Sequence, residues 1–174
     1  TGTVKEFLQH YQNTLVEAQR EPDSTSVDKK SEMEPLVLEW LKQTKFWEEN
    51  KGNAEIHPQF ELGKYLKQLD KSYNHPNYRV DFLLVYNDEE GHDHKIIIEY
   101  DGFMEHFGAS AHFVNESNYQ DYYSPEDVYR QHVLEGYGYR FIRINKFNLG
   151  DDPIATLDSR IQEIVKKNFI NTKS

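Results

Sequence analysis

The sequence has no cysteine among its 174 residues. Disulfide bonds, zinc sites built on thiolates and thiol nucleophiles are therefore excluded. Long hydrophobic runs are missing too: the longest apolar stretches are residues 82–86 and 96–98, far short of the roughly 20 residues that cross a bilayer. The N-terminus carries no basic-then-apolar signal pattern. We therefore expect a protein with no membrane association and a cytoplasmic location.

Positive charge is scarce, because 20 lysines and arginines stand against 30 aspartates and glutamates and give a formal net charge of −10. Proteins that hold nucleic-acid phosphates usually cluster lysine and arginine, so this balance argues at first sight against DNA binding. A divalent-metal site, however, needs several carboxylates, which count as negative until the cation arrives. The sequence also lacks a glycine-rich phosphate loop, which disfavours a nucleotide- or sugar-processing enzyme.

Two parts of unequal size are predicted along the chain. Apolar residues recur at helical spacing over residues 4–19, and the polar segment 21–30 contains Pro22 and is typical of a linker. We therefore expect residues 1–30 to be an N-terminal helix and linker, appended to a folded domain over residues 31–174. Since the chain does not begin with Met, we expect Thr1 to be a cut end and the chain to be a piece of a larger polypeptide.

The domain shows a succession of helical and strand patterns. Helix starts are indicated by Ser31-x-x-Glu34 or, alternatively, by Pro35 as first helical residue, and by Ser124-Pro125. The predicted elements are a helix to about residue 43, a loop 48–54, a strand 55–62 that Pro58 places at an edge, strands 79–86 and 95–100 joined by the turn 87–94, a long loop 102–123, a helix 124–135, a strand 139–145 and a helix 153–168. This order indicates an α/β (α+β) fold.

Three carboxylates stand at the ends of the two clearest strands. Asp81 interrupts an otherwise apolar strand, while Glu99 and Asp101 close the next one and share a face. If the hairpin is centred on its turn, Asp81 lies opposite Glu99 with the side chains about 5 Å apart. Two like charges so close need a positive partner, and oxygen ligands suit Mg²⁺ or Mn²⁺. A shifted register, or an ion pair of Asp81 with Arg79 or Arg143, is the alternative.

These residues carry a family resemblance. The sequences RVDF at 79–82, IEYDG at 98–102 and EH at 105–106 resemble the PD-(D/E)XK nuclease superfamily, and within it the restriction-endonuclease-like domains akin to very-short-patch mismatch-repair endonucleases. Asp127-x-x-Arg130 and the strand segment 138–144 extend the likeness. The resemblance implies an αβββαβ core with a central mixed sheet flanked by helices, and metal-dependent hydrolysis of DNA phosphodiester bonds. Similar domains end large helicase-like or ATPase proteins, so DNA and the other domains of such a polypeptide are the expected partners.

Carried over residue by residue, the resemblance makes Asp81 the metal-binding aspartate, Glu99 the second acidic ligand and the Tyr100 carbonyl a third, for Mg²⁺ or Mn²⁺. Asp101 stands where the usual pattern has a lysine, which orients the attacking water or stabilises the developing charge. His106 is the candidate replacement, as a general acid or base or as a donor to phosphate. Its alternative is a loop histidine without a role. Without a replacement, we expect a catalytically weak module that binds DNA or a partner domain.

Four further residues receive supporting roles from the resemblance. Glu34 matches an acidic residue that holds a metal-bound water, with a helix cap as the alternative. Gln59 stands at the edge of the site, or is a plain strand residue. Asp127 and Arg130 steady the site or touch phosphate, or form an ordinary surface pair.

The histidines of residues 92–94 are either transition-metal ligands or, as we favour, part of a solvated hairpin tip.

Overall fold

The computed structural model describes residues 30–102 and 123–173 of the chain. Its elements are α2 (Lys30–Lys42), α3 (Lys45–Asn50), β1 (Ala54–Glu61), α4 (Leu62–Leu69), β2 (Arg79–Asn87), β3 (Asp93–Tyr100), α6 (Pro125–Gly136), β4 (Arg140–Ile144) and α7 (Pro153–Lys173). The predicted helix 4–19, its linker up to residue 29 and loop residues 103–122, which include His106, lie outside the described residues.

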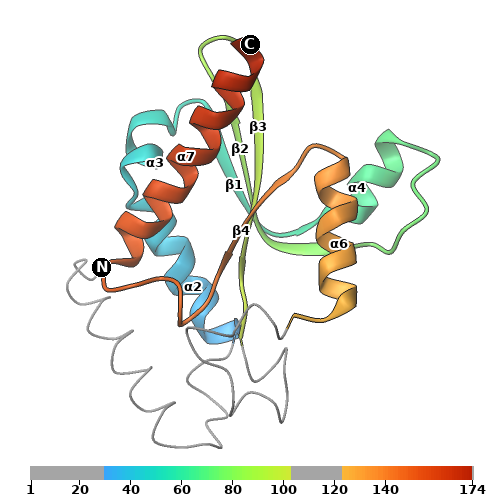
Figure 1. Ribbon diagram of the computed structural model, residues 1–174, viewed down its shortest axis with the longest axis horizontal. Helices are drawn as coiled ribbons and strands as arrows, with labels where there is room; N and C mark the ends of the chain where they lie inside the picture. The colour runs from blue at the N-terminus through green and yellow to red at the C-terminus, as the bar shows by residue number, and fades with distance from the viewer. Residues whose placement is uncertain (1–29, 103–122, 174) are drawn as a thin grey trace, which may run out of the picture.

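The four strands form one mixed sheet in the order β1-β2-β3-β4 (Figure 1). β1 pairs with β2 and β2 with β3 in antiparallel fashion, whereas β3 and β4 are parallel. The parallel pair needs a crossover, and α6 lies on the connection between its two strands. The mixed sheet flanked by helices confirms the predicted α/β (α+β) class. β1 lies at an edge of the sheet, as Pro58 predicted.

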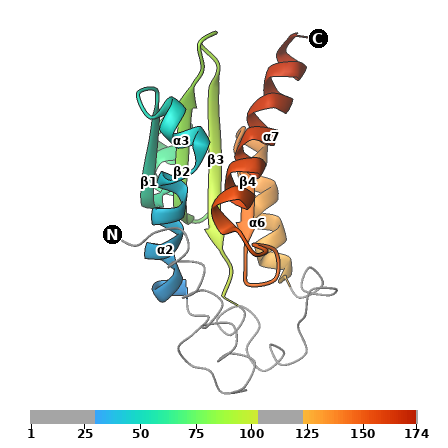
Figure 2. The same ribbon diagram turned by 90° about the vertical axis from the view of Figure 1, so that its left-hand side faces the viewer.

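Helices cover both faces of the sheet (Figures 1 and 2). β2 and β3 are buried on both sides, which explains their continuous apolar runs. The core between the sheet and α2, α3 and α7 includes Met33, Val37, Trp40, Phe46, Phe82, Leu84, Ile96, Ile98, Leu157 and Ile161. The core on the side of α4 and α6 includes Leu62, Leu66, Tyr73, Val80, Leu83, Ile97, Leu134 and Tyr139.

The start of α2 differs from both predicted starts. The helix already includes Lys30, which the sequence pattern assigned to the linker, and it contains Pro35 in its interior. Proline lacks the N–H that would bond to the carbonyl four residues earlier, so Pro35 leaves the Ser31 carbonyl without its usual helical donor. The earlier start matters for the site, because it brings the side chain of Lys30 onto the folded domain.

Two short helices were not predicted. Thr44 begins α3 as its N-cap, with its hydroxyl accepting from the Trp47 N–H at 3.1 Å. This helix occupies part of the predicted loop 48–54. In α4, Leu62 and Leu66 are buried one turn apart against the sheet. The sequence did carry this second signal, as leucines at helical spacing in residues 62–69.

Gly63 permits a close backbone approach that fixes the entry into β2. Its N–H donates to the Tyr78 carbonyl at 3.0 Å. A Cβ at this position would meet the backbone of Asn77 and come within 2.5 Å of the Pro76 oxygen. We expect Gly63→Ala to lower the free energy of unfolding by about 3 kcal/mol. Urea denaturation tests this against Gly52→Ala, whose Cβ would have no atom within 4 Å; equal stabilities would contradict the prediction.

Candidate functional site

The hairpin register brings the three predicted carboxylates to one end of the sheet. Phe82 pairs with Ile98, and the next position along this register sets Asp81 opposite Glu99, as predicted. Asp81, Glu99 and Asp101 are 4%, 3% and 1% exposed. A buried carboxylate is costly unless it is paired with a cation or bound to a metal. In the structure each of the three has its own cationic partner.

Asp81 is held by α2 and by β3. Its Oδ1 lies 2.7 Å from the Lys30 Nζ, and its Oδ2 accepts from the Tyr100 N–H at 3.0 Å. Burial raises the pKa of Asp81 to about 6; Lys30 opposes this shift and the charge of Glu99 adds to it. Burial by itself would lower the pKa of Lys30, but Asp81 and the two other carboxylates raise it above its ordinary value. At neutral pH both groups are therefore charged.

Glu99 is anchored by α6. Arg130 donates from Nη1 to Glu99 Oε1 at 2.7 Å and from Nη2 to Oε2, so the two side chains form a bidentate pair. The same guanidinium donates to the Arg79 carbonyl at 3.1 Å and lies 5.7 Å from the centre of the Tyr78 ring. Hydrogen bonding to Glu99 outweighs burial and raises the pKa of Arg130.

Asp101 is anchored by β4. Arg143 donates from Nε to Asp101 Oδ2 at 3.1 Å and from Nη2 to Oδ1 at 2.9 Å. The Tyr123 hydroxyl also donates to Oδ2, at 2.7 Å, and its ring lies 4.3 Å from the guanidinium carbon. The hydrogen bonds and charge of Asp101 outweigh burial and raise the pKa of Arg143, while burial and the charge of Asp101 raise that of Tyr123. Asp127 approaches Arg143 at 3.9 Å, so it supports the site.

The ion pairs of these carboxylates differ from the alternative considered in the sequence analysis, in which Asp81 pairs with Arg79 or Arg143. Arg143 does pair with a site carboxylate, but with Asp101 rather than Asp81. Arg130 pairs with Glu99 and reaches the site from α6, whereas the sequence left a surface pair with Asp127 open. Lys30 was missed entirely, because no local pattern shows which cation the fold places beside Asp81.

The described residues also bear on the predicted metal ligands. Within residues 30–102 and 123–173, no group of three or more histidine, aspartate or glutamate side chains is arranged to hold a metal ion. The oxygens of Asp81, Glu99 and Asp101 are instead engaged by ammonium, guanidinium, hydroxyl and N–H groups. These donors therefore bind the same carboxylate oxygens that Mg²⁺ or Mn²⁺ would prefer as ligands.

Glu34 and Gln59 lie together at the rim of the site. The Gln59 amide donates to Glu34 Oε2 at 2.9 Å and so ties β1 to α2. Gln59 has a φ of 50°, a left-handed conformation that non-glycine residues rarely adopt. Strain of this kind persists only where surrounding contacts over-determine it, and it often marks functional positions. Glu34 lies one turn after Lys30 on the same helix, so both face this end of the sheet.

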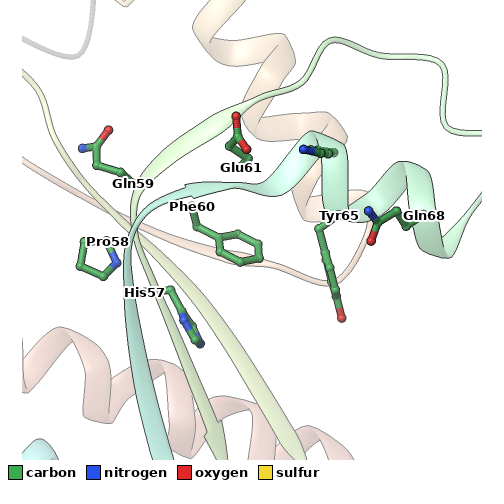
Figure 3. Close-up of a pocket in the computed structure, with 8 residues that line it drawn as sticks. His57, Pro58, Gln59, Phe60, Glu61, Tyr65 and Gln68 are labelled. Atoms are coloured by element: carbon green, nitrogen blue, oxygen red, sulfur yellow. The ribbon is translucent and has the colours of Figure 1, made fainter.

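A surface groove of about 370 Å³ opens at the kink in β1 (Figure 3). Phe60 lies between two aromatic neighbours, with ring centres 5.7 Å from His57 and 5.8 Å from Tyr65. Lys64 and Gln68 also line the groove. Figure 3 shows Gln59 pointing away from the rings of Phe60 and Tyr65. Glu61 lines the groove, but Asp81, Glu99 and Asp101 do not, so the groove lies beside the site and meets it at Gln59.

The histidines near the hairpin turn are held by a carboxylate. His94 is buried, and its Nε2 lies 2.9 Å from Asp88 Oδ2, while Asp88 Oδ1 accepts from the backbone N–H groups of Glu90 and His92. Burial would raise the pKa of Asp88, but these hydrogen bonds outweigh it and lower the pKa to about 2. The hairpin tip is thus a structural clamp, and the solvated tip favoured from the sequence is wrong for His94, which is buried against Asp88.

This clamp predicts a pH dependence of stability. Because the pKa of Asp88 is lower in the folded than in the unfolded chain, its contribution is present above about pH 4 and is lost as the pH falls toward about 2. We expect Asp88→Ala to lower the free energy of unfolding by about 2 kcal/mol at pH 7 and by less at pH 3. Urea denaturation at both pH values, with the exposed Glu89→Ala as control, tests this. An equal loss at both pH values would contradict it.

The described helices include none that is both long and apolar enough to cross a membrane. No protein-family model, curated protein or solved structure was found to match the chain. The function must therefore be argued from the site itself.

Proposed function

We propose that the protein is a metal-dependent nuclease of the PD-(D/E)XK type that hydrolyses DNA phosphodiester bonds, as one domain of a larger DNA-processing protein. The observation that supports this most is the meeting of Asp81, Glu99 and Asp101 at one end of a mixed sheet, in the register that the sequence predicted. Three buried carboxylates are expensive for stability, and a purely structural role does not require them. A site that must attract a divalent cation does.

The donor set fits Mg²⁺ or Mn²⁺, which bind oxygen ligands and retain several waters. Asp81 Oδ1, a Glu99 oxygen and the Tyr100 carbonyl would hold the ion. Once bound, the ion supplies Lewis acidity at the phosphodiester and favours deprotonation of water. In hydrolysis, water oxygen bonds to phosphorus, the bond from phosphorus to the leaving oxygen breaks, and that oxygen ends protonated.

The protein's own residues position these groups. Arg130 and Arg143 fix Glu99 and Asp101 in bidentate pairs, so the carboxylates need little reorganisation when substrate arrives. The hydrogen bond from Gln59 restricts the orientation of the Glu34 carboxylate, which would orient a water at the rim of the site. The aromatic rings of the groove next to Gln59 offer stacking faces for a nucleic-acid strand, and Lys64 offers a positive charge beside the negative charge of Glu61.

The test is cleavage of labelled single- and double-stranded DNA in Mg²⁺, Mn²⁺ or EDTA. We expect cutting with Mn²⁺ that EDTA abolishes and that falls at least a hundredfold in Asp81→Asn. Glu89→Gln removes a carboxylate from the exposed hairpin tip and should cut like the wild type. Equal cutting by Asp81→Asn would overturn the proposal. Bound Mn²⁺ and bound DNA without any cutting would instead favour the non-catalytic binding module, with Asp101 in place of lysine as the reason.

A further inference from the structure

Lys30 is held differently from the two arginines of the carboxylate cluster. Arg130 and Arg143 each donate to both oxygens of their carboxylates. Lys30 makes its ion pair with one oxygen of Asp81, and its side chain is 29% exposed, against 16% for Arg130 and 11% for Arg143. Of the three counter-ions, Lys30 is therefore the one that water reaches best and that can leave by rotation of its own side chain.

Lys30 also approaches from a different direction. The arginines come from α6 and β4, whereas Lys30 begins α2, whose first turn lies at the same end of the sheet as the end of β3 (Figures 1 and 2). Asp81 Oδ2 already accepts from the Tyr100 N–H, whereas Oδ1 is paired with Lys30, so displacement of Lys30 would open Oδ1 to an external cation. The ammonium of Lys30 stands 2.7 Å from this oxygen. A divalent cation on Oδ1 and the ammonium group would repel each other at such a distance.

We propose that Lys30 is a built-in counter-ion of the cation site, which occupies Asp81 Oδ1 until a divalent cation replaces it. The inference rests on the proposed function, because it concerns the same cation site. Lysine suits this role, since its ammonium is a single, strongly hydrated charge on a flexible stem. A bidentate arginine would be harder to displace. In the absence of metal, Lys30 compensates the charge of Asp81; in its presence, Lys30 turns to solvent.

The exchange has a measurable consequence for metal affinity. If Lys30 leaves Asp81 free about a tenth of the time, the apparent affinity for the cation is about tenfold weaker than that of the open site. Lys30→Met removes the charge at similar length, and Lys30→Arg retains it. Lys42→Met is the matched control, because Lys42 is an exposed lysine in the last turn of the same helix.

The experiment is calorimetric titration of each folded variant with Mn²⁺ alone. We expect Lys30→Met to bind Mn²⁺ about tenfold more tightly than the wild type, Lys30→Arg to bind no more tightly and Lys42→Met to bind equally. Unchanged or weaker binding by Lys30→Met, while Asp81→Asn abolishes binding, would overturn the inference and leave the proposed cation site intact. No Mn²⁺ binding by any variant would overturn both. Tighter binding without DNA cleavage would support the counter-ion and count against the nuclease.

A second measurement uses the wild type and does not depend on the variants folding. Lysines are acetylated at a low level with and without Mn²⁺, and each site is quantified by mass spectrometry. We expect Mn²⁺ to raise the rate at Lys30 several-fold, because the ammonium is released into water, and to leave Lys42 unchanged. Equal rates at Lys30 in the two conditions, under Mn²⁺ saturation, would overturn the inference.

Discussion

Asp101→Lys is expected to lower the free energy of unfolding by at least about 3–5 kcal/mol, although it restores the lysine of the usual pattern. Asp101 is 1% exposed, and both its oxygens are engaged by Arg143. A lysine there would lose this pair and place an ammonium against a guanidinium within the fold. Loss of one partner from a buried ion pair destabilises by about 3–5 kcal/mol. Repulsion adds to this loss, and a domain of this size has a total stability of about 5–15 kcal/mol.

Circular dichroism during thermal and urea denaturation measures the effect. Asp151→Lys makes the same substitution at an exposed aspartate before α7 and should change stability by no more than about 0.5 kcal/mol. The charge-swapped double variant Asp101→Lys with Arg143→Glu should recover part of the loss, since a pair of opposite charges is formed again. A folded Asp101→Lys variant of wild-type stability would show that the pair with Arg143 does not hold Asp101.

The elements that the sequence predicted well are those with strong local signals. The apolar runs of β2 and β3 flank a polar turn with a glycine, and this arrangement alone set the register that places Asp81 opposite Glu99. Ser124 and Pro125 begin α6 as predicted, with the Ser124 hydroxyl accepting from the Asp127 N–H at 3.1 Å. In each case neighbours in the sequence determine the structure.

The parts that the sequence did not predict depend on contacts between distant elements. Packing of Met33 and Val37 against the sheet stabilises α2 despite Pro35, and the helix extends further toward the N-terminus than the sequence predicted. That small shift placed Lys30 beside Asp81. Like charges at Asp81 and Glu99 correctly indicated that positive charge was needed. The packing of α2 and α6 against the sheet shows that Lys30 and Arg130 of the chain itself supply this positive charge.

Glu99→Gln and Asp81→Asn are expected to have opposite consequences for stability, although both neutralise a buried carboxylate of the same hairpin. Glu99→Gln leaves Arg130 largely buried and with its charge unbalanced, which lowers the free energy of unfolding by about 3 kcal/mol. Asp81→Asn retains an oxygen to accept from the Tyr100 N–H, and Lys30 can turn to water. We expect this variant to be at least as stable as the wild type at pH 7.5.

The pH dependence of each variant's stability relative to the wild type distinguishes Asp81→Asn from Glu99→Gln more sharply than a measurement at one pH. Because the pKa of Asp81 rises from 3.8 to about 6 in the folded protein, its contribution to stability is fully present below about pH 4 and is lost as the pH rises through about 6. The stability of Asp81→Asn relative to the wild type should therefore increase between pH 4.5 and pH 7.5 in urea denaturation. The stability of Glu99→Gln should remain below that of the wild type at both pH values. If Asp81→Asn instead lost as much stability as Glu99→Gln, Lys30 would have to be a fixed structural partner like the arginines, and its exchange for a divalent cation would become costly.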